Sequence, residues 1–154
     1  MSGILSPALA THPFLHGMCD DHLAVLAQVA TEVTFPAGYR LFEDGGNATR
    51  FWLIESGRVA LDLQIPGDGP AVIEHVGMSE LLGWSWLFPP YQWAFGAVTV
   101  TTVKAFEFDA VEVRAHCASD PELLYDLTQR IAQILAHRLR TTRVRLLCEC
   151  HTAE

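Results

Sequence analysis

Basic residues are scarce in this sequence of 154 residues, which carries 10 lysines and arginines against 18 acidic residues and a formal net charge of −8. A chain this acidic is not expected to bind nucleic acid or an anionic membrane over its whole surface. No lysine or arginine precedes Arg40, so the amino terminus lacks the charged start of a secretory signal. The sequence also has no uninterrupted apolar run of about 18 residues or more. We therefore expect no membrane span and a cytoplasmic location.

Cysteine is sparse as well, with four in the chain. Cys19, Cys117, Cys148 and Cys150 are too few and too unevenly placed for a disulfide framework. Cys148, Cys150 and His151 could act as soft metal ligands, but a closed zinc site needs four ligands with wider spacing between pairs. We expect a frayed tail there, and neither a metal nor a cofactor in the protein.

The amino-terminal part of the chain shows a helical periodicity. Residues 1–11 are small and apolar without a period, which indicates a loose arm. Within residues 12–32, Leu23, Leu26 and Ala27 follow a three- and four-residue spacing. This spacing puts one apolar stripe on a short helix, which predicts a helix that packs on a core.

Residues 33–109 show the pattern of β-structure. Apolar residues recur over short stretches, and each stretch ends at Gly, Pro, Asn or Asp. The expected strands are 33–35, 39–42, 51–54, 59–63, 71–76, 97–103 and 105–108. Strands of this length and spacing indicate an antiparallel β-roll of the jelly-roll or double-stranded β-helix type. The predicted fold is mainly β with an N-terminal helix and a long C-terminal helix, in a single domain over residues 1–154.

Residues 110–147 are predicted to be helical. A short helix follows Asp109, and Ser119-Asp-Pro-Glu122 then reads as a capping box with Ser119 as the N-cap. The helix that it opens runs to about Leu147. It carries a stripe of leucines and isoleucines that is wider than a single helix–helix interface requires. Such a stripe can face two neighbours, either its own domain alone or also a second chain.

The first half of the β-roll carries the motifs of a known family. Phe35-Pro-Ala-Gly38, Leu41-Phe42, Gly45, the quartet Phe51 to Ile54, and Gly57 with Val59 follow one another in this order. This series resembles the opening signature of the cyclic-nucleotide-binding domain family, the sensor β-roll of catabolite-activator-type regulators, and the resemblance covers about residues 12–147. It implies a parallel homodimer through the long helix. The expected interface residues are Leu124, Leu127, Ile131, Leu135 and Leu139.

The resemblance also implies a phosphate-binding cassette over residues 82–96. In the family this segment opens with Gly-Glu, whose carboxylate binds the ribose, and it ends with an Arg that pairs with the cyclic phosphate. Here Gly83 keeps the glycine, but Trp84 stands at the Glu position and Trp93 at the Arg position. A phosphate buried without its guanidinium partner loses a charge-assisted interaction. We therefore expect that cyclic AMP and cyclic GMP are not bound in the usual way.

Two main interpretations of this aromatic segment stay open. Its rings could fill the vacated pocket, which leaves a stand-alone regulatory or protein-interaction module. Alternatively, the tryptophans could line a pocket for another apolar or aromatic small molecule. The candidate ligand-binding residues are Gly83, Trp84, Ser85, Tyr91, Gln92, Trp93 and Ala94. A non-standard mode of nucleotide binding and an aromatic patch for a partner protein are further alternatives.

Catalysis has little support in the sequence. A cupin-like metalloenzyme is a distant alternative, because His75 stands alone among the strands where such enzymes carry clustered ligands. No catalytic residue is expected, and the chain is predicted not to be an enzyme.

Charge is unevenly distributed along the chain. Residues 1–126 hold sixteen of the acids and only five of the bases, whereas the long helix carries Arg130 and four further arginines. One use for these arginines is an anionic partner, but we favour a solvated face that complements the negative end of the helix dipole. Because the chain ends a few residues after this helix, without room for a helix-turn-helix, no DNA binding is expected.

Overall fold

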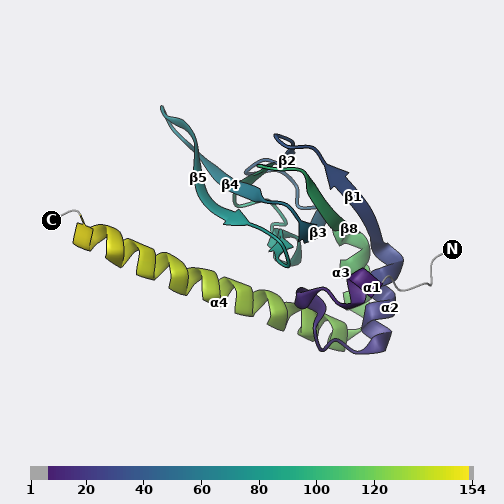
Figure 1. Cartoon of the computed structure of the whole chain (residues 1–154). Helices are drawn as coiled ribbons and strands as arrows, with labels where there is room; N and C mark the ends of the chain where they lie inside the picture. Colours follow the sequence, from purple (N-terminus) through teal and green to yellow (C-terminus); the bar gives the residue numbers. More distant parts are fainter. Residues whose placement is uncertain (1–6, 153–154) are drawn as a thin grey trace.

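The structure is a computed structural model that describes residues 7–152, with side chains described through residue 150. Its centre is a β-roll of two four-stranded antiparallel sheets, one in the order β1-β8-β3-β6 and the other in the order β2-β7-β4-β5 (Figure 1). The strands are β1 (Ala30–Phe35), β2 (Arg40–Phe42), β3 (Arg50–Ser56), β4 (Val59–Ile65), β5 (Gly69–Val76), β6 (Leu81–Leu82), β7 (Gly96–Thr99) and β8 (Val103–Asp109). The predicted β-roll with flanking helices is confirmed.

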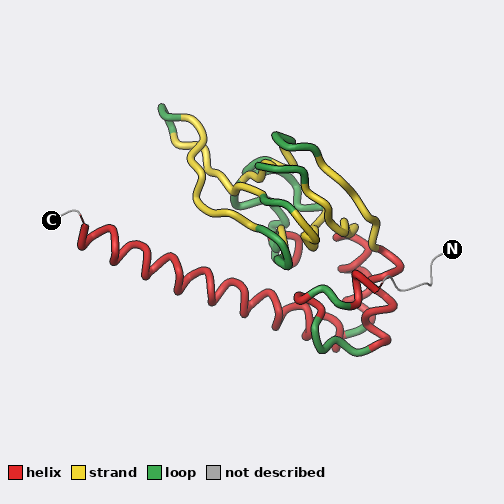
Figure 2. Tube along the Cα trace, in the orientation of Figure 1, coloured by secondary structure: helices red, strands yellow, loops and turns green. Residues whose placement is uncertain are grey.

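Most of the helices gather at one end of the roll, and the longest runs beneath it (Figures 1 and 2). They are α1 (Pro7–Ala10), the 3-10 helix η1 (Pro13–Leu15), α2 (Asp20–Val29), η2 (Ser85–Leu87, also 3-10), α3 (Ala110–Ser119) and α4 (Pro121–Thr152). The expected loose arm is wrong for residues 7–10, where α1 forms and Leu9 is buried in the core. The rest of that arm, residues 1–6, lies outside the described residues.

The first sheet separates its side chains onto two faces. Phe51 pairs with Phe108 in register and stacks on it, with ring centroids 4.7 Å apart. Trp52, one residue along, points to the opposite face and stacks on Phe42 of the second sheet at 5.7 Å. Because successive strand residues alternate between faces, Phe51 packs on the helical side while Trp52 fills the space between the sheets.

The predicted strand 97–103 is interrupted in the structure. β7 ends at Thr99 and β8 begins at Val103. The hydroxyl of Thr99 donates to the carbonyl of Pro36 at 2.6 Å and accepts from the amide of Tyr39 at 2.8 Å. These bonds fix the end of β7, and the chain then crosses to the other sheet. Alternating threonines and valines on both sides of the crossing gave no signal for it.

The capping box at the start of α4 is wrong by one residue. Ser119 belongs to the last turn of α3, where its hydroxyl donates to the carbonyl of His116 at 3.1 Å. Asp120 is the capping residue instead, and its Oδ1 accepts from the amide of Leu123 at 3.3 Å. A single residue separates α3 from α4, so Asp120 ends one helix and caps the next. Pro121 is therefore the first helical position, whereas the predicted box with Ser119 as the cap placed it second; it lies in the first turn in both cases.

α4 has 32 residues and continues past the expected end at Leu147 as far as Thr152, so the predicted frayed tail at Cys148 and Cys150 is also wrong. Leu127 and Ile131 are fully buried against their own chain. Both were predicted at a dimer interface, and this burial removes them from one. Leu124 and Leu139 remain exposed, and Leu135 is half-buried against the core.

None of the helices in the described range has the length and apolarity to cross a membrane.

Candidate functional site

The cassette segment, residues 82–96, is irregular as its prolines and aromatics predicted. It leaves β6 at Gly83, makes the single 3-10 turn η2, and returns to β7. Its second half is held to the turn between β2 and β3. The amide of Gly45 donates to the carbonyl of Trp93, and the amide of Trp93 donates to the carbonyl of Gly46, both at 2.8 Å. These bonds place the Trp93 side chain at the entrance to the space between the sheets.

Trp93 occupies the interior of the cassette. Its side chain is buried and stacks on Phe42, with centroids 3.8 Å apart and planes 16° apart. A Cβ atom built on Gly83 would lie 2.8 Å from the Trp93 ring, so the ring rests directly on the glycine backbone. The position that the sequence assigned to a phosphate-binding arginine therefore holds an indole packed against the first residue of the cassette.

The remaining tryptophans of the cassette extend the core in other directions. Trp86 is fully buried, stacks on Phe51 at 4.4 Å, and donates its Nε1–H to the carbonyl of Gly83 at 3.2 Å. Trp84 is half-buried and meets Phe95 edge-on at 5.9 Å. The indole nitrogen of Trp84 and the hydroxyl of Ser85 are both buried without a hydrogen-bond partner in the described chain. Buried polar atoms of this kind usually bind a partner, so these two are the unexplained polar groups of the site.

The predicted ligand-binding residues do not form one surface. Gly83, Ser85 and Trp93 are buried and Trp84 is half-buried. In contrast, three residues of the second half point outward and do not face the interior. They are Tyr91, Gln92 and Ala94. Tyr91 has a positive φ of 57°, a left-handed conformation that few side chains adopt.

Two arginines approach the cassette from other parts of the chain. Arg114 on α3 donates to the carbonyl of Trp86 at 2.8 Å, and its guanidinium lies 4.3 Å from the centre of the Tyr91 ring. The sequence gave no signal for this contact, because Arg114 lies in another helix and only the packing of α3 on η2 brings it close. Arg114 therefore does not take the place of the Glu or the Arg that the resemblance led us to expect in the cassette. It contacts the cassette from outside, at the carbonyl of Trp86 and the ring of Tyr91.

Arg40 is the second of these arginines, and it is held in a bidentate ion pair. Its two terminal nitrogens donate to the two carboxylate oxygens of Asp62, both at 2.8 Å, and the Asp62 side chain is only 7% exposed. The hydrogen bond to Asp62 raises the pKa of Arg40 above its ordinary value. This pair joins β2 to β4 across the second sheet, so Arg40 is occupied in the fold.

The described surface includes three cavities, near the cassette, near the pair of Arg40 and Asp62, and near α4, and the cassette contributes Trp93 to the first of them. That cavity, about 250 Å³, lies between Trp93, Trp52 and Tyr39. A cavity of about 190 Å³ lies beside Arg40 and Asp62, and one of about 700 Å³ lies between α4 and β5. Among the described residues, no group of three or more His, Cys, Asp or Glu side chains is placed to hold a metal ion.

Comparison with known proteins identifies the fold and its family. The model of the cyclic nucleotide-binding domain matches residues 32–120, which is more than half of the chain. The chain belongs to the cyclic nucleotide-binding domain family. The match begins in β1 and ends at the residue that caps α4, so it contains the cassette and all of the roll except the first two residues of β1. The family assignment based on the opening signature is confirmed.

A relative within the family is the CRP-like cAMP-activated global transcriptional regulator of Mycobacterium tuberculosis, 28% identical over 134 residues. The match covers 87% of this chain and 58% of the regulator, so the chain spans somewhat over half of the length of that relative. Two solved structures share the fold. A cyclic nucleotide-binding protein from Geobacter metallireducens has a TM-score of 0.80 at 23% identity, covering 88% of this chain and 99% of the other. The catabolite activator protein of Thermus thermophilus has a TM-score of 0.68 at 22% identity, covering 87% and 61%.

Proposed function

We propose that this chain is a regulatory module of the cyclic nucleotide-binding domain family that does not bind cyclic AMP or cyclic GMP in the usual way. The observation that carries this proposal is the position of Trp93, buried on Gly83 and stacked on Phe42. An indole in that place takes the volume and removes the charge that a cyclic phosphate requires. The names of the relatives support a regulatory role and not an enzymatic one.

The electrostatics of the cassette favour the same conclusion. Residues 82–96 contain no lysine or arginine. Of the arginines nearby, Arg40 is bound to Asp62 and Arg114 to the carbonyl of Trp86. Arg50, which lines the cavity beside Trp93, is paired with Glu107. A buried phosphate monoanion without a cation leaves an unpaired charge, which costs several kcal/mol, or a factor of about a thousand in affinity.

Isothermal titration of the purified chain with cyclic AMP and cyclic GMP tests this proposal. We expect no saturable heat in the micromolar range, and no difference from 5′-AMP as a control ligand. Tryptophan fluorescence recorded in parallel should stay constant, since Trp84 and Trp93 lie where a nucleotide would enter. Saturable micromolar binding of either cyclic nucleotide, with quenching, would overturn the proposal.

A second candidate function is that of a sensor for another small molecule at the cassette. The observation in its favour is the pair of buried, unpartnered polar atoms, Trp84 Nε1 and Ser85 Oγ. Native mass spectrometry of the purified chain tests it. A bound mass that is lost in Ser85→Ala would support the sensor, whereas the mass of the polypeptide alone would favour the filled cassette.

We further propose that the chain is a homodimer through the exposed face of α4. Leu135, Leu139, Thr142 and Leu146 follow a three- and four-residue spacing, and Leu139 and Leu146 are more than half exposed. A heptad-like spacing of this kind is what a two-stranded coiled coil uses. The seam proposed here differs from the predicted one, because Leu127 and Ile131 pack inside their own domain.

A further inference from the structure

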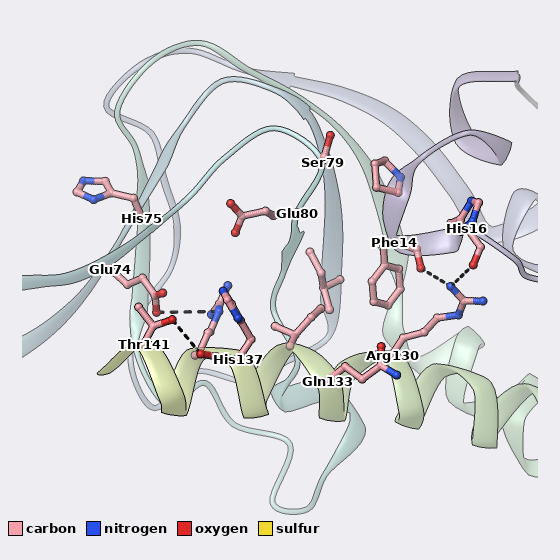
Figure 3. Close-up of a pocket in the computed structure, with 14 residues that line it drawn as sticks. Phe14, His16, Glu74, His75, Ser79, Glu80, Arg130, Gln133, His137 and Thr141 are labelled. Carbon is pink, nitrogen blue, oxygen red and sulfur yellow. Dashed lines mark hydrogen bonds and ion pairs between the residues drawn. The ribbon is translucent and has the colours of Figure 1, made fainter. Parts of the chain in front are cut away.

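The largest of the three cavities lies outside the cassette. It has a volume of about 700 Å³ and is bounded by η1, by the end of β5 and the residues before β6, and by the middle of α4 (Figure 3). No residue of the segment 83–96 lines it. Its size falls within the range of small-molecule sites, about 300–1,000 Å³. A ligand bound there would contact α4 and the roll together without touching the tryptophans.

Charged groups with few partners meet at one end of this cavity. The Arg138 side chain is only 15% exposed, yet its nearest carboxylate oxygen, on Glu74, is 4.0 Å from its Nε. That distance exceeds a hydrogen bond, and no hydrogen bond from Arg138 to another described residue is present. An enclosed guanidinium with its donors unused is suited to a planar, bidentate oxyanion such as a carboxylate.

Acidic groups face the same space. The carboxylate of Glu80 points into the cavity above α4 (Figure 3), and it forms no ion pair or side-chain hydrogen bond with a described residue. Glu74 lies at the side, with only the distant Arg138 as its partner. Two carboxylates beside one guanidinium disfavour a simple anion, and the guanidinium disfavours a simple cation. A ligand that carries both charges satisfies all three groups.

The rest of the lining has an apolar wall, a paired arginine and uncharged or weakly basic polar side chains, which are His16, His75, Ser79, Gln133, His137 and Thr141. Leu81 is buried, and Ile134 and Phe14 are half-buried, so together they form an apolar wall. Arg130, at the far end, binds Asp126 and donates to the carbonyls of Phe14 and His16. Arg130 therefore holds η1 on α4 and is not available to a ligand. The cavity thus has one dipolar end and one apolar wall.

We propose that this cavity binds an α-amino acid with an apolar side chain. The carboxylate of the ligand binds the Arg138 guanidinium, its ammonium binds Glu74 and Glu80, and its side chain lies against Leu81 and Ile134. Nε of Arg138 and Oε2 of Glu74 are 4.0 Å apart, too far for a hydrogen bond to each other but close enough for both to contact a ligand whose two charges are adjacent, as they are in an α-amino acid. Because β5 and α4 both contribute, binding fixes α4 against the roll. This inference does not depend on what the cassette binds.

Isothermal titration with L-leucine, L-methionine and L-phenylalanine tests the proposal. 4-Methylpentanoate, which lacks the ammonium of leucine, and 3-methylbutylamine, which lacks its carboxylate, serve as matched half-ligands. We expect saturable binding of at least one amino acid and at least tenfold weaker binding of both half-ligands. The absence of saturable heat from all three amino acids, or a half-ligand that binds as well as leucine, would overturn it.

Variants locate the site. Arg138→Gln and Glu80→Gln should each weaken binding of the amino acid at least tenfold. Arg140→Gln on the exposed face of α4 and Glu112→Gln in α3 are matched controls, and they should stay within twofold of the original chain. Unchanged affinity in both cavity variants would place the ligand elsewhere and refute the assignment. The half-ligand comparison on the unaltered chain decides the matter even if a cavity variant fails to fold.

Discussion

At the scale of single residues, Gly83 shows how closely the cassette is packed. It has a φ of 94° and the Trp93 ring lies where its Cβ would be, whereas Gly67 has a similar φ of 89° with nothing within 4 Å. Gly83→Ala should therefore destabilise the fold by about 1–3 kcal/mol more than Gly67→Ala, which meets only the backbone cost of about 1–2 kcal/mol. Urea unfolding of both variants measures the difference. Equal losses would show that Trp93 can move away from Gly83, and would weaken the filled-cassette proposal.

Cys117 is a buried thiol whose reactivity the structure predicts. Burial, assisted by the negative charge of Asp120, raises the pKa of Cys117 to about 11. At about pH 8 the thiol is protonated and only 4% exposed, so it should not react with Ellman's reagent in the folded chain. The exposed Cys19 should react promptly. Cys117→Ser should leave the number of fast-reacting thiols unchanged, and a loss of one fast thiol in this variant would contradict the prediction.

His12 makes stability depend on pH. It is buried, its Nε2 lies 2.9 Å from the carbonyl oxygen of Ile54, and its Nδ1 accepts from the amide of Phe14 at 3.2 Å. Burial lowers the pKa of His12 below 6.5 in the folded chain. As the pH falls through 6.5, the unfolded chain gains a proton that the folded chain does not, and stability decreases, by at most about 1.4 kcal/mol per pH unit. Above that range His12 contributes no pH dependence.

Urea unfolding at about pH 7.5 and about pH 5.5, on either side of the histidine range, measures this effect. The loss of stability on acidification should be smaller in His12→Gln than in the original chain. His16→Gln, at an exposed position, is the control and should keep the original slope. An identical slope in all three proteins would assign the pH dependence to other groups.

At the scale of elements, the junction between α3 and α4 depends on Asp120. This residue caps α4 and also lies 3.2 Å from His22 of α2, so it joins three helices. Asp120→Ala should cost about 1–2 kcal/mol of stability, the upper range for a lost N-cap. Ser119→Ala should change stability by less than about 0.5 kcal/mol, since its hydroxyl only donates within its own helix. Thermal unfolding of the two variants shows which residue is the N-cap. A larger loss of stability in Ser119→Ala than in Asp120→Ala would support the capping box predicted from the sequence.

At the scale of the whole molecule, the exposed apolar face of α4 should hold two chains together. Light scattering should give twice the 17.0 kDa of one chain, and Leu139→Glu should reduce this mass to that of a monomer by placing a charge in the seam. Val111→Glu, at a similarly exposed apolar residue of α3, is the control and should remain dimeric. A monomeric original chain, or a dimeric Leu139→Glu, would refute the proposed interface.

Features of the fold that depend on neighbouring residues could be predicted from the sequence, whereas features that depend on distant contacts could not. Strand positions, turns and the irregular cassette follow from alternation, glycine and proline, all of which act on neighbouring residues. The assignment of Ser119 as a cap failed because two adjacent residues, Ser119 and Asp120, are both of types that favour the N-cap position, and only the end of α3 distinguishes them. The division of the leucines of α4 into buried and exposed sets likewise depended on what packs against each face.

The sequence alone determined the β-roll and its family, because both follow from residue types at fixed spacing, and it predicted tryptophans at the Glu and Arg positions of the cassette. Tertiary structure decided what surrounds them. Trp93 rests on Phe42, some fifty positions earlier in the chain, and Arg114 reaches the cassette only through the packing of α3. The large cavity is assembled from three distant segments, 13–16, 74–81 and 130–141. Contacts between segments so far apart leave no periodic signal in the sequence, because their geometry exists only once the sheets and helices have packed.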